Sequence, residues 1–171
     1  MSTTPPGELS LRPATTADVP AIQRLIEPLV EQRILLGKEL VMLYEAVQEF
    51  VVAETGGELA GCGALHVFWD DLGEIRTLAV SESHKGKGVG GAILDALEQR
   101  ARTLGLKKLF CLTFEVEFFT DHGYREVSDP IVDTEVYVEL VRSPDEGVAE
   151  FLDLARVKPN TLGNSRMLKN L

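Results

Sequence analysis

Near the start of the chain, apolar residues fall at helical spacing after one short strand-like segment. Leu9 to Arg12 predicts a strand. The next segment repeats apolar residues every three or four positions, at Val19, Ile22, Leu25, Ile26 and Leu29. Thr15 and Asp18 match a capping box at the start of this helix, and Pro28 is expected to kink it or end it nearby. A second helix is expected from about Leu40 to Glu49, which leaves Ile34 to Lys38 as an exposed bend and a candidate pocket wall.

Strand patterns follow at Phe50 to Glu54, Leu59 to Phe68 and Gly73 to Val80. The turn Thr55-Gly56-Gly57-Glu58 joins the first two as a hairpin, so the sheet is expected to be antiparallel here. An amphipathic helix from Ala92 to Leu104 then leads to a strand at Lys108 to Phe114. Because a right-handed crossover returns the chain in the same direction, this strand is expected to run parallel to Gly73 to Val80.

The last third of the chain gives weaker patterns. Phe118 to His122 indicates a short helix, and Gly123-Tyr124 a turn into another strand. Val148 to Leu154 predicts the last strand, and Lys158 to Leu171 a polar tail. These elements predict a mixed, mostly antiparallel sheet. Residues 1–8 are expected to form a disordered lead and residues 9–171 a single domain.

The composition is that of an ordinary soluble protein with an acidic balance. The 171 residues are 44% apolar and carry a formal net charge of -10, which argues against nucleic acid and anionic membrane surfaces as partners. No apolar run reaches membrane-spanning length and the start does not match a signal peptide, so we expect a cytoplasmic protein. Cys62 and Cys111 are expected to be buried, reduced thiols. His66, His84 and His122 lack metal-ligand spacing, so no metal site is expected.

A glycine-rich turn between the strand Gly73 to Val80 and the next helix is the clearest chemical signal. It contains Lys85, Gly86, Lys87, Gly88, Val89, Gly90 and Gly91. Glycines let backbone N–H groups approach an anion, and the helix aims its positive end at the same place, so we expect a phosphorylated cofactor. From Ser81 to Lys108, six basic residues against three acidic ones add positive charge. The alternative, a glycine-dependent tight turn, does not explain so many glycines.

Two better-known phosphate loops do not fit this turn. It lacks the Gly-Lys-Ser/Thr ending of an NTPase loop, and Lys107 to Phe114 holds no acidic residue for a dinucleotide ribose. In spacing, Lys85 to Gly90 resembles the Gln/Arg-x-x-Gly-x-Gly/Ala loop of the GCN5-related N-acetyltransferase (GNAT) family, with Lys in place of Gln/Arg. The order of elements resembles that family over nearly the whole chain. So do the segments Leu11 to Thr15, Gly61 to Ala64 and Phe118 to Tyr124.

The resemblance implies an α/β (α+β) fold, with a central sheet flanked by helices, and acetyl-CoA as the cosubstrate. It also implies that backbone groups of Leu78, Ala79 and Val80 contact the pantetheine arm and polarise the thioester. Amides from Gly86 to Gly91, with Lys85 and Lys87 beside them, would hold the pyrophosphate. In an alternating strand, Glu74, Arg76, Leu78 and Val80 are expected to share one face.

A narrower resemblance is to short, stand-alone amino-acid N-acetyltransferases of the N-acetylglutamate synthase kind. The segments that carry it are Leu43 to Glu54, Gly73 to Val80 and Lys158 to Leu168. It implies acetyl transfer to the α-amino group of L-glutamate or L-glutamine, the first step of arginine biosynthesis. The alternatives are the same fold acting on another small amine or a protein N-terminus, and a non-catalytic acyl-CoA sensor. A homodimer through the C-terminal strand and tail is also open.

Glu74 stands where several members of the family carry a carboxylate base, which takes a proton from the substrate ammonium directly or through water. The alternative is that Glu74 lies at a solvated strand end or serves as a partner of Arg76. Glu115 and Glu117 are other candidate bases.

An acidic amino-acid substrate brings two carboxylates, and their burial requires cations or many N–H donors. Arg76, Lys38 and Arg166 are the candidate cations. Arg76 is the strongest because an arginine within an apolar strand is costly unless it is paired, although pairing with Glu74 would satisfy that need equally well.

The candidate general acid departs from the family pattern. Many relatives carry a tyrosine where this chain has Phe119, and phenylalanine cannot donate a proton. Tyr124 is a further candidate, although a core position suits it better. A thiol with a pKa of roughly 8.5 is a tolerable leaving group without an acid.

Overall fold

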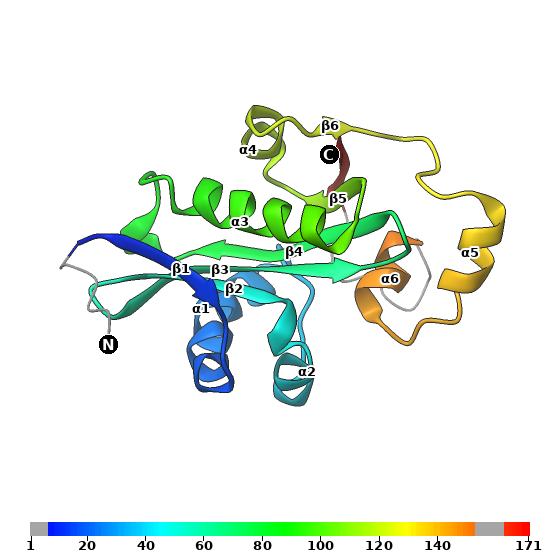
Figure 1. Ribbon diagram of the computed structural model, residues 1–171. Helices are drawn as coiled ribbons and strands as arrows, with labels where there is room; N and C mark the ends of the chain where they lie inside the picture. The colour runs from blue at the N-terminus through cyan, green and yellow to red at the C-terminus, as the bar shows by residue number, and fades with distance from the viewer. Residues whose placement is uncertain (1–6, 153–162) are drawn as a thin grey trace.

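The computed structural model describes residues 7–152 and 163–171 of the chain. Within these residues, one seven-stranded sheet has the order β1-β2-β3-β4-β5-β7-β6 (Figure 1). Its strands are β1 (Leu9–Pro13), β2 (Phe50–Thr55), β3 (Glu58–Val67), β4 (Leu72–Val80), β5 (Lys108–Thr113), β6 (Arg125–Glu126) and β7 (Ser165–Asn170). Neighbouring strands are antiparallel except β4 and β5, which are parallel. The predicted mixed, mostly antiparallel sheet is therefore confirmed.

Helices cover both faces of the sheet (Figure 1). One face carries α1 (Val19–Glu31) and α2 (Leu40–Glu45), and the other carries α3 (Val89–Leu104) and α4 (Val116–Asp121). Helices α5 (Thr134–Leu140) and α6 (Glu146–Phe151) follow toward one end of the sheet. The predicted α/β class with flanking helices is thus confirmed.

The first helix follows its sequence signals closely, and the second does so in part. Thr15 and Asp18 form the expected capping box, and α1 passes through Pro28 before it ends at Glu31. The second predicted helix, about Leu40 to Glu49, is interrupted. It divides into α2 and a short 3-10 helix at Val47–Glu49.

Three clusters of buried side chains hold the layers together. Helix α3 buries Ile93, Leu94 and Leu97 against one face of the sheet. Helices α1 and α2 bury Val19, Ile22, Ile26 and Leu43 against the opposite face of β2 and β3. A third cluster joins α5 and α6 to β5 and β7, with Phe68, Phe110 and Phe151 in aromatic contact. Because Leu109 and Cys111 pack toward α3 and Phe110 packs toward α6, α6 lies on the face opposite α3.

Two predictions for the end of the chain are wrong. Val148 to Leu154 was expected to be a strand, but α6 occupies Glu146–Phe151. Residues 153–154 lie outside the described part of the chain. The apolar run is helical because Asp145 caps it and Val148 and Phe151, three positions apart, turn the same side to the third cluster.

The expected polar tail of Lys158 to Leu171 contains strand β7, although residues 158–162 are not described. This strand pairs with both β5 and β6, and its Met167 and Leu168 are buried. The disordered lead predicted for residues 1–8 also falls largely outside the described residues, and β1 begins at Leu9. The single domain stays a prediction.

Candidate functional site

Strands β4 and β5 separate shortly after they meet. Their paired residues are Leu72 to Glu74 on β4 and Lys108 to Phe110 on β5. Beyond these pairs, a cavity of about 70 Å³ lies between Ile75–Leu78 and Cys111–Thr113. Within the described residues, the β5-facing edge of β4 past Glu74 has no partner strand. Its backbone N–H and C=O groups are therefore open to an extended ligand.

A β-bulge at Thr77 divides β4 into two parts that face differently. Gly63 of β3 lies opposite both Thr77 and Leu78, because Cys62 pairs with Ala79 and Ala64 with Arg76. Thr77 has a φ of 55°, a strained value for a β-branched residue.

The bulge changes which side chains of β4 lie together. Leu78 and Val80 pack with Ile75 on the side of α3, whereas Arg76 contacts Phe68 in the third cluster on the other side. The prediction that Glu74, Arg76, Leu78 and Val80 share one face is therefore wrong. Simple alternation fails because the bulge inserts one extra residue. The side chains before and after Thr77 are thereby turned to different faces of the sheet.

The glycine-rich loop has a left-handed backbone at two of its glycines. Gly86 and Gly88 have φ values of 74° and 79°, and a Cβ at either position would meet nothing within 4 Å. Helix α3 begins at Val89, three residues earlier than predicted, and Ala92 N–H donates to Gly88 C=O. The amides of the first turn have no partner inside the helix, so they are available to phosphate oxygens.

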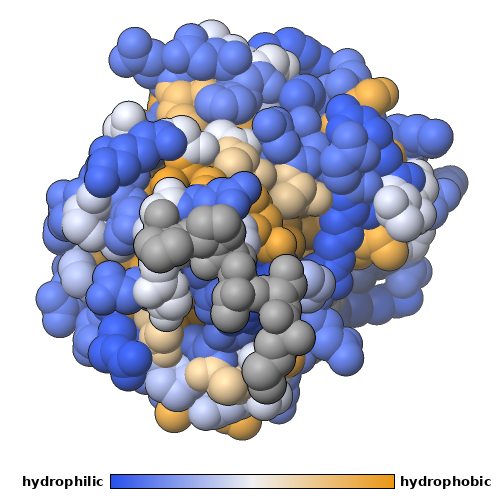
Figure 2. All heavy atoms as spheres, turned by 60° about the vertical axis from the view of Figure 1, so that its left-hand side comes forward, coloured by the Kyte–Doolittle hydropathy of each residue, from blue (hydrophilic) through white to orange (hydrophobic). Residues whose placement is uncertain are grey.

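Exposed side chains surround this loop. Lys85 pairs with Glu82 at 2.6 Å, and Lys87 is exposed. The end of the sheet that lies to the left in Figure 1 is turned forward in Figure 2, where hydrophilic residues surround an apolar area. On its other side the loop meets α4. A Cβ at Gly90 would lie 3.4 Å from the Phe118 ring, and one at Gly91 would lie 2.9 Å from His122 Nε2.

Glu74 and Arg76 form a buried ion pair beside the cavity. Arg76 Nη2 and Nε donate to Glu74 Oε2 at 2.7 and 3.2 Å. Burial raises the pKa of Glu74, and the charge of Arg76 opposes this rise. Every fully buried side-chain oxygen or nitrogen in the described residues has a hydrogen-bond partner. Glu74 is 5% exposed and lines the cavity.

Arg76 also binds a residue that the sequence did not indicate. Its Nη1 and Nη2 donate to the two carboxylate oxygens of Asp145 at 3.1 and 3.0 Å. Burial alone would lower the pKa of Arg76, but the charges of Glu74 and Asp145 raise it. The four hydrogen bonds use four of the five N–H donors of the guanidinium. Arg76 is therefore committed chiefly to these two carboxylates.

His66 and Glu49 extend the network away from the cavity. His66 Nδ1 bonds to Glu49 Oε1, and His66 Nε2 lies 3.9 Å from Asp145 Oδ2. His66 pairs with Glu74 across β3 and β4. These residues were missed because they are far apart in sequence and match no motif. Only the strand pairing and the approach of α6 bring them together.

Lys38 belongs to the cavity wall, and Arg166 lies near it. The bend that contains Ile34, Leu35, Leu36 and Lys38 lines the cavity, as does α6 through Gly147 and Glu150. Burial lowers the pKa of Lys38, and the charge of Arg76 adds to this effect. Arg166 on β7 stacks over the Phe151 ring at 5.4 Å and does not line the cavity.

The remaining candidates lie in other positions. Glu115 and Glu117 are exposed and outside the cavity lining. Phe119 lines the cavity. Tyr124 packs against the Phe119 ring in the core. The Tyr124 hydroxyl donates to Glu98 at 3.2 Å, and burial together with the Glu98 charge raises the pKa of Tyr124. A tyrosine held in this way is a poor proton donor to the cavity.

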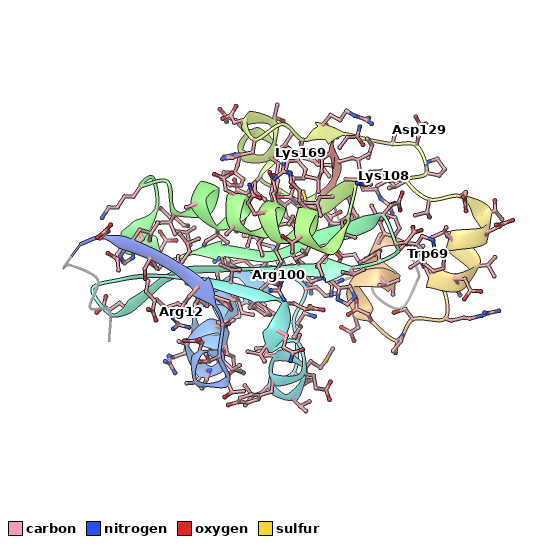
Figure 3. The ribbon with its side chains drawn as sticks, in the orientation of Figure 1. Arg12, Trp69, Arg100, Lys108, Asp129 and Lys169 are labelled. Carbon is pink, nitrogen blue, oxygen red and sulfur yellow. The ribbon has the colours of Figure 1, made fainter. Side chains whose placement is uncertain are left out.

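Glu98 is itself held by Lys169 of β7. Lys169 Nζ donates to both Glu98 carboxylate oxygens, at 3.0 and 2.9 Å, and to His122 C=O at 2.9 Å. Figure 3 labels Lys169 beside α3 and α4. This buried pair ties the last strand to the helix that begins at the glycine loop.

Comparison with known proteins gives the family. The chain belongs to the acetyltransferase (GNAT) family, whose model matches residues 22–124. It is 58% identical over 161 residues to an amino-acid acetyltransferase from Mycobacterium tuberculosis, and the match covers 92% of each chain. The family resemblance predicted from the sequence is confirmed.

Solved structures agree in fold. A crystal structure of a Mycobacterium tuberculosis protein in complex with CoA and NLQ has a TM-score of 0.91 and 57% identity, covering 95% of this chain and 99% of that chain. N-acetylglutamate synthase from Neisseria gonorrhoeae, complexed with coenzyme A and N-acetyl-glutamate, has a TM-score of 0.77 and 30% identity. That match covers 96% of this chain and 35% of the Neisseria chain. Among the described residues, no helix is long and apolar enough to span a membrane.

Proposed function

We propose that this protein transfers the acetyl group of acetyl-CoA to the α-amino group of L-glutamine or L-glutamate. The observation that carries the proposal is the buried carboxylate of Glu74, which lines the cavity at the point where β4 and β5 separate. The amino-acid acetyltransferase and N-acetylglutamate synthase relatives support the same activity. We infer that the reaction is the first step of arginine biosynthesis and takes place in the cytoplasm.

The residues present fit the coenzyme. The glycine loop leaves open space at Gly86 and Gly88 and offers the free amides of α3 to a pyrophosphate. The unpaired edge of β4 at Leu78 to Val80 offers backbone groups to a pantetheine arm. When bound, acetyl-CoA supplies the thioester carbon that is attacked and the thiol that leaves. We infer that Lys85 and Lys87 add positive charge near the pyrophosphate.

Glu74 and Lys38 have different roles toward the amino acid: Glu74 is the base, and Lys38 binds a carboxylate. The substrate amine must lose a proton before it can attack, and the Glu74 carboxylate lines the cavity where it can take that proton. A carboxylate whose pKa is raised by burial is a stronger base than an exposed one. Lys38 Nζ is suited to the substrate α-carboxylate. Phe119 offers no proton to the leaving group, so CoA leaves as the thiolate, which is a tolerable leaving group because the pKa of a thiol is roughly 8.5.

The charges around the cavity favour a substrate with one carboxylate. Arg76 is already paired with Glu74 and Asp145, which leaves Lys38 as the cavity-lining cation with no carboxylate at hydrogen-bond distance in the described residues. One cation matches one carboxylate, so we expect glutamine to be preferred over glutamate. Arg166 is the candidate that would accept a second carboxylate, and a preference for glutamate would indicate that it does. The homodimer stays a prediction.

The test is free-thiol release from acetyl-CoA by the purified protein with each amino acid, a polyamine and an N-terminal peptide. We expect turnover confined to glutamine and glutamate. Glu74→Gln should lose roughly 100-fold or more in kcat while it keeps its affinity for CoA, because it removes the base and leaves the loop intact. Glu115→Gln is the control, and it should behave as the wild type.

Three results would contradict the proposal. Turnover with the peptide or the polyamine alone would assign the same fold to another amine. Saturable CoA binding without turnover would favour an acyl-CoA sensor. Full activity of Glu74→Gln across the pH range would eliminate Glu74 as the base.

A further inference from the structure

Asp145 attaches one wall of the cavity to the central sheet. Its carboxylate accepts two hydrogen bonds from Arg76 of β4, and its Oδ1 also accepts from Val148 N–H at 2.9 Å, which caps the start of α6. Helix α6 supplies Gly147 and Glu150 to the cavity lining. The same side chain therefore fixes both the guanidinium beside Glu74 and the helix that faces it.

The fit between Arg76 and α6 is close enough to require a glycine. A Cβ at Gly147 would lie 2.5 Å from Arg76 Nη2 and 3.0 Å from Asp145 Oδ1. Real Cβ atoms do not approach other atoms so closely. The guanidinium thus lies directly against the first turn of α6, and this contact depends on the absence of a side chain at position 147.

A histidine of β3 also lies near Asp145. His66 of β3 places Nε2 3.9 Å from Asp145 Oδ2, while its Nδ1 bonds to Glu49. Asp145 is not among the residues that line the cavity. Its influence must pass through Arg76 and α6.

We propose that Asp145 is a positioning residue for the amino-acid side of the reaction, which holds Arg76 between Glu74 and α6 and thereby sets both the basicity of Glu74 and the shape of the substrate wall. This rests on the proposed function. The geometry that carries it is the shared guanidinium, bonded to Glu74 on one side and bidentate to Asp145 on the other.

The direction of the effect on Glu74 follows from the surrounding charges. Glu74 faces Arg76 on its own strand, Asp145 and Glu150 from the α6 region, and Lys38 from the bend. His66 lies opposite it on β3, and Cys111 is on β5.

Removal of the Asp145 charge takes away one carboxylate that repels the Glu74 carboxylate. Glu74 is then the one carboxylate of this pair that still binds Arg76. The pKa of Glu74 should then fall, and the acidic limb of kcat/KM should move to lower pH.

The test compares Asp145→Ser with Asp133→Ser. Serine caps helices well, so Asp145→Ser keeps an acceptor for Val148 N–H but loses the charge and the bidentate contact. Asp133 caps α5 in the same way, accepting from Val136 N–H at 3.0 Å, and makes no contact with Arg76. Asp133→Ser therefore reproduces the replacement of a helix cap and leaves the contacts of Arg76 unchanged.

We expect Asp145→Ser to raise KM for the amino acid about tenfold, because charge-assisted hydrogen bonds to the wall are lost. KM for acetyl-CoA should stay within about twofold, since the glycine loop is untouched. The acidic limb of kcat/KM should move to lower pH. Asp133→Ser should show the wild-type KM values and pH profile. Far-UV circular dichroism and CoA binding establish that each variant is folded.

The outcomes separate this proposal from the function on which it rests. An active wild type with unchanged amino-acid KM and pH profile in Asp145→Ser would overturn the positioning role alone. Equal increases in both KM values, or the same changes in Asp133→Ser, would also overturn it, because they would indicate a general loss of structure. A wild type without turnover on any amino acid would overturn the proposed function, and the positioning role with it.

Discussion

Gly88 and Gly105 provide a matched pair for testing the coenzyme loop, because they bound the same helix. Gly88 precedes α3 with a φ of 79°, and Gly105 follows it with a φ of 90°. Both are exposed, and a Cβ at either would meet nothing within 4 Å. Alanine at these positions therefore adds no clash. The cost is that of a left-handed backbone, about 1–2 kcal/mol.

The two substitutions should show this cost in different measurements. At Gly105 the backbone is part of the helix end, where its N–H bonds to Arg102 C=O, so the cost should appear as lost stability. For a chain of this size a loss of about 1–2 kcal/mol lowers Tm by roughly 2–8 °C. At Gly88 the exposed loop can relax in the free protein, so the cost is imposed when the ligand requires the original conformation. The same free energy then weakens CoA binding by roughly 5- to 30-fold.

Isothermal titration with CoA and thermal unfolding together distinguish these effects. We expect Gly88→Ala to raise the Kd for CoA and Gly105→Ala to leave it unchanged. An unchanged Kd in Gly88→Ala would refute the assignment of this loop to the coenzyme. So would an equal increase of Kd in Gly105→Ala, since that residue lies at the far end of the helix.

Three further predictions concern Lys38, Lys169 and Tyr124. Lys38→Met should raise KM for the amino acid roughly tenfold and leave the CoA Kd unchanged, as measured by steady-state kinetics and titration; an equal effect on both would argue against contact with the α-carboxylate. Lys169→Met removes the short contacts of the buried Glu98, which keeps Arg102 Nη2 at 3.9 Å, and should cost roughly 2 kcal/mol in urea unfolding. Tyr124→Phe removes one hydrogen bond to Glu98 and should cost about 1 kcal/mol. Arg142→Met, which breaks only an exposed pair, should cost less than about 0.5 kcal/mol and serves as the control.

Elements that depend on local pattern were predicted well. The hairpin from Phe50 to Phe68 and the strand before the glycine loop follow from alternation and turn residues over short distances. The parallel pairing of Lys108 to Phe110 follows from the handedness of a single crossover. The glycine loop could be recognised because a close backbone approach requires a particular residue type at fixed positions.

Elements that depend on distant partners were not predicted. Strand β7 has only Met167 and Leu168 as apolar residues, and it is a strand because β5 and β6 pair with it from both sides. Val148 to Phe151 is apolar enough for either a strand or a helix, and the cap at Asp145 and the cluster around Phe110 decide the outcome. A short apolar run does not contain that information.

The residues of the candidate site also divide into those that the sequence predicted and those that it did not. Glu74 and Lys38 were predicted, and both line the cavity. The sequence did not predict Asp145, His66 and Glu49. These residues come from three separate segments that meet only in the folded protein, around the Arg76 guanidinium and Asp145. The bulge at Thr77 was also missed, since alternation gives no sign of an inserted residue.

The position of β7 between β5 and β6 has a consequence for synthesis on the ribosome. Residues 114–164 must be made after β5 before its antiparallel partner begins. Until then, β5 presents an open edge with Leu109, Phe110 and Cys111, which are buried in the finished sheet. An exposed apolar edge is a template for pairing with other chains. The nascent protein should therefore be most prone to aggregate after β5 has been made and before Ser165 to Asn170 emerges.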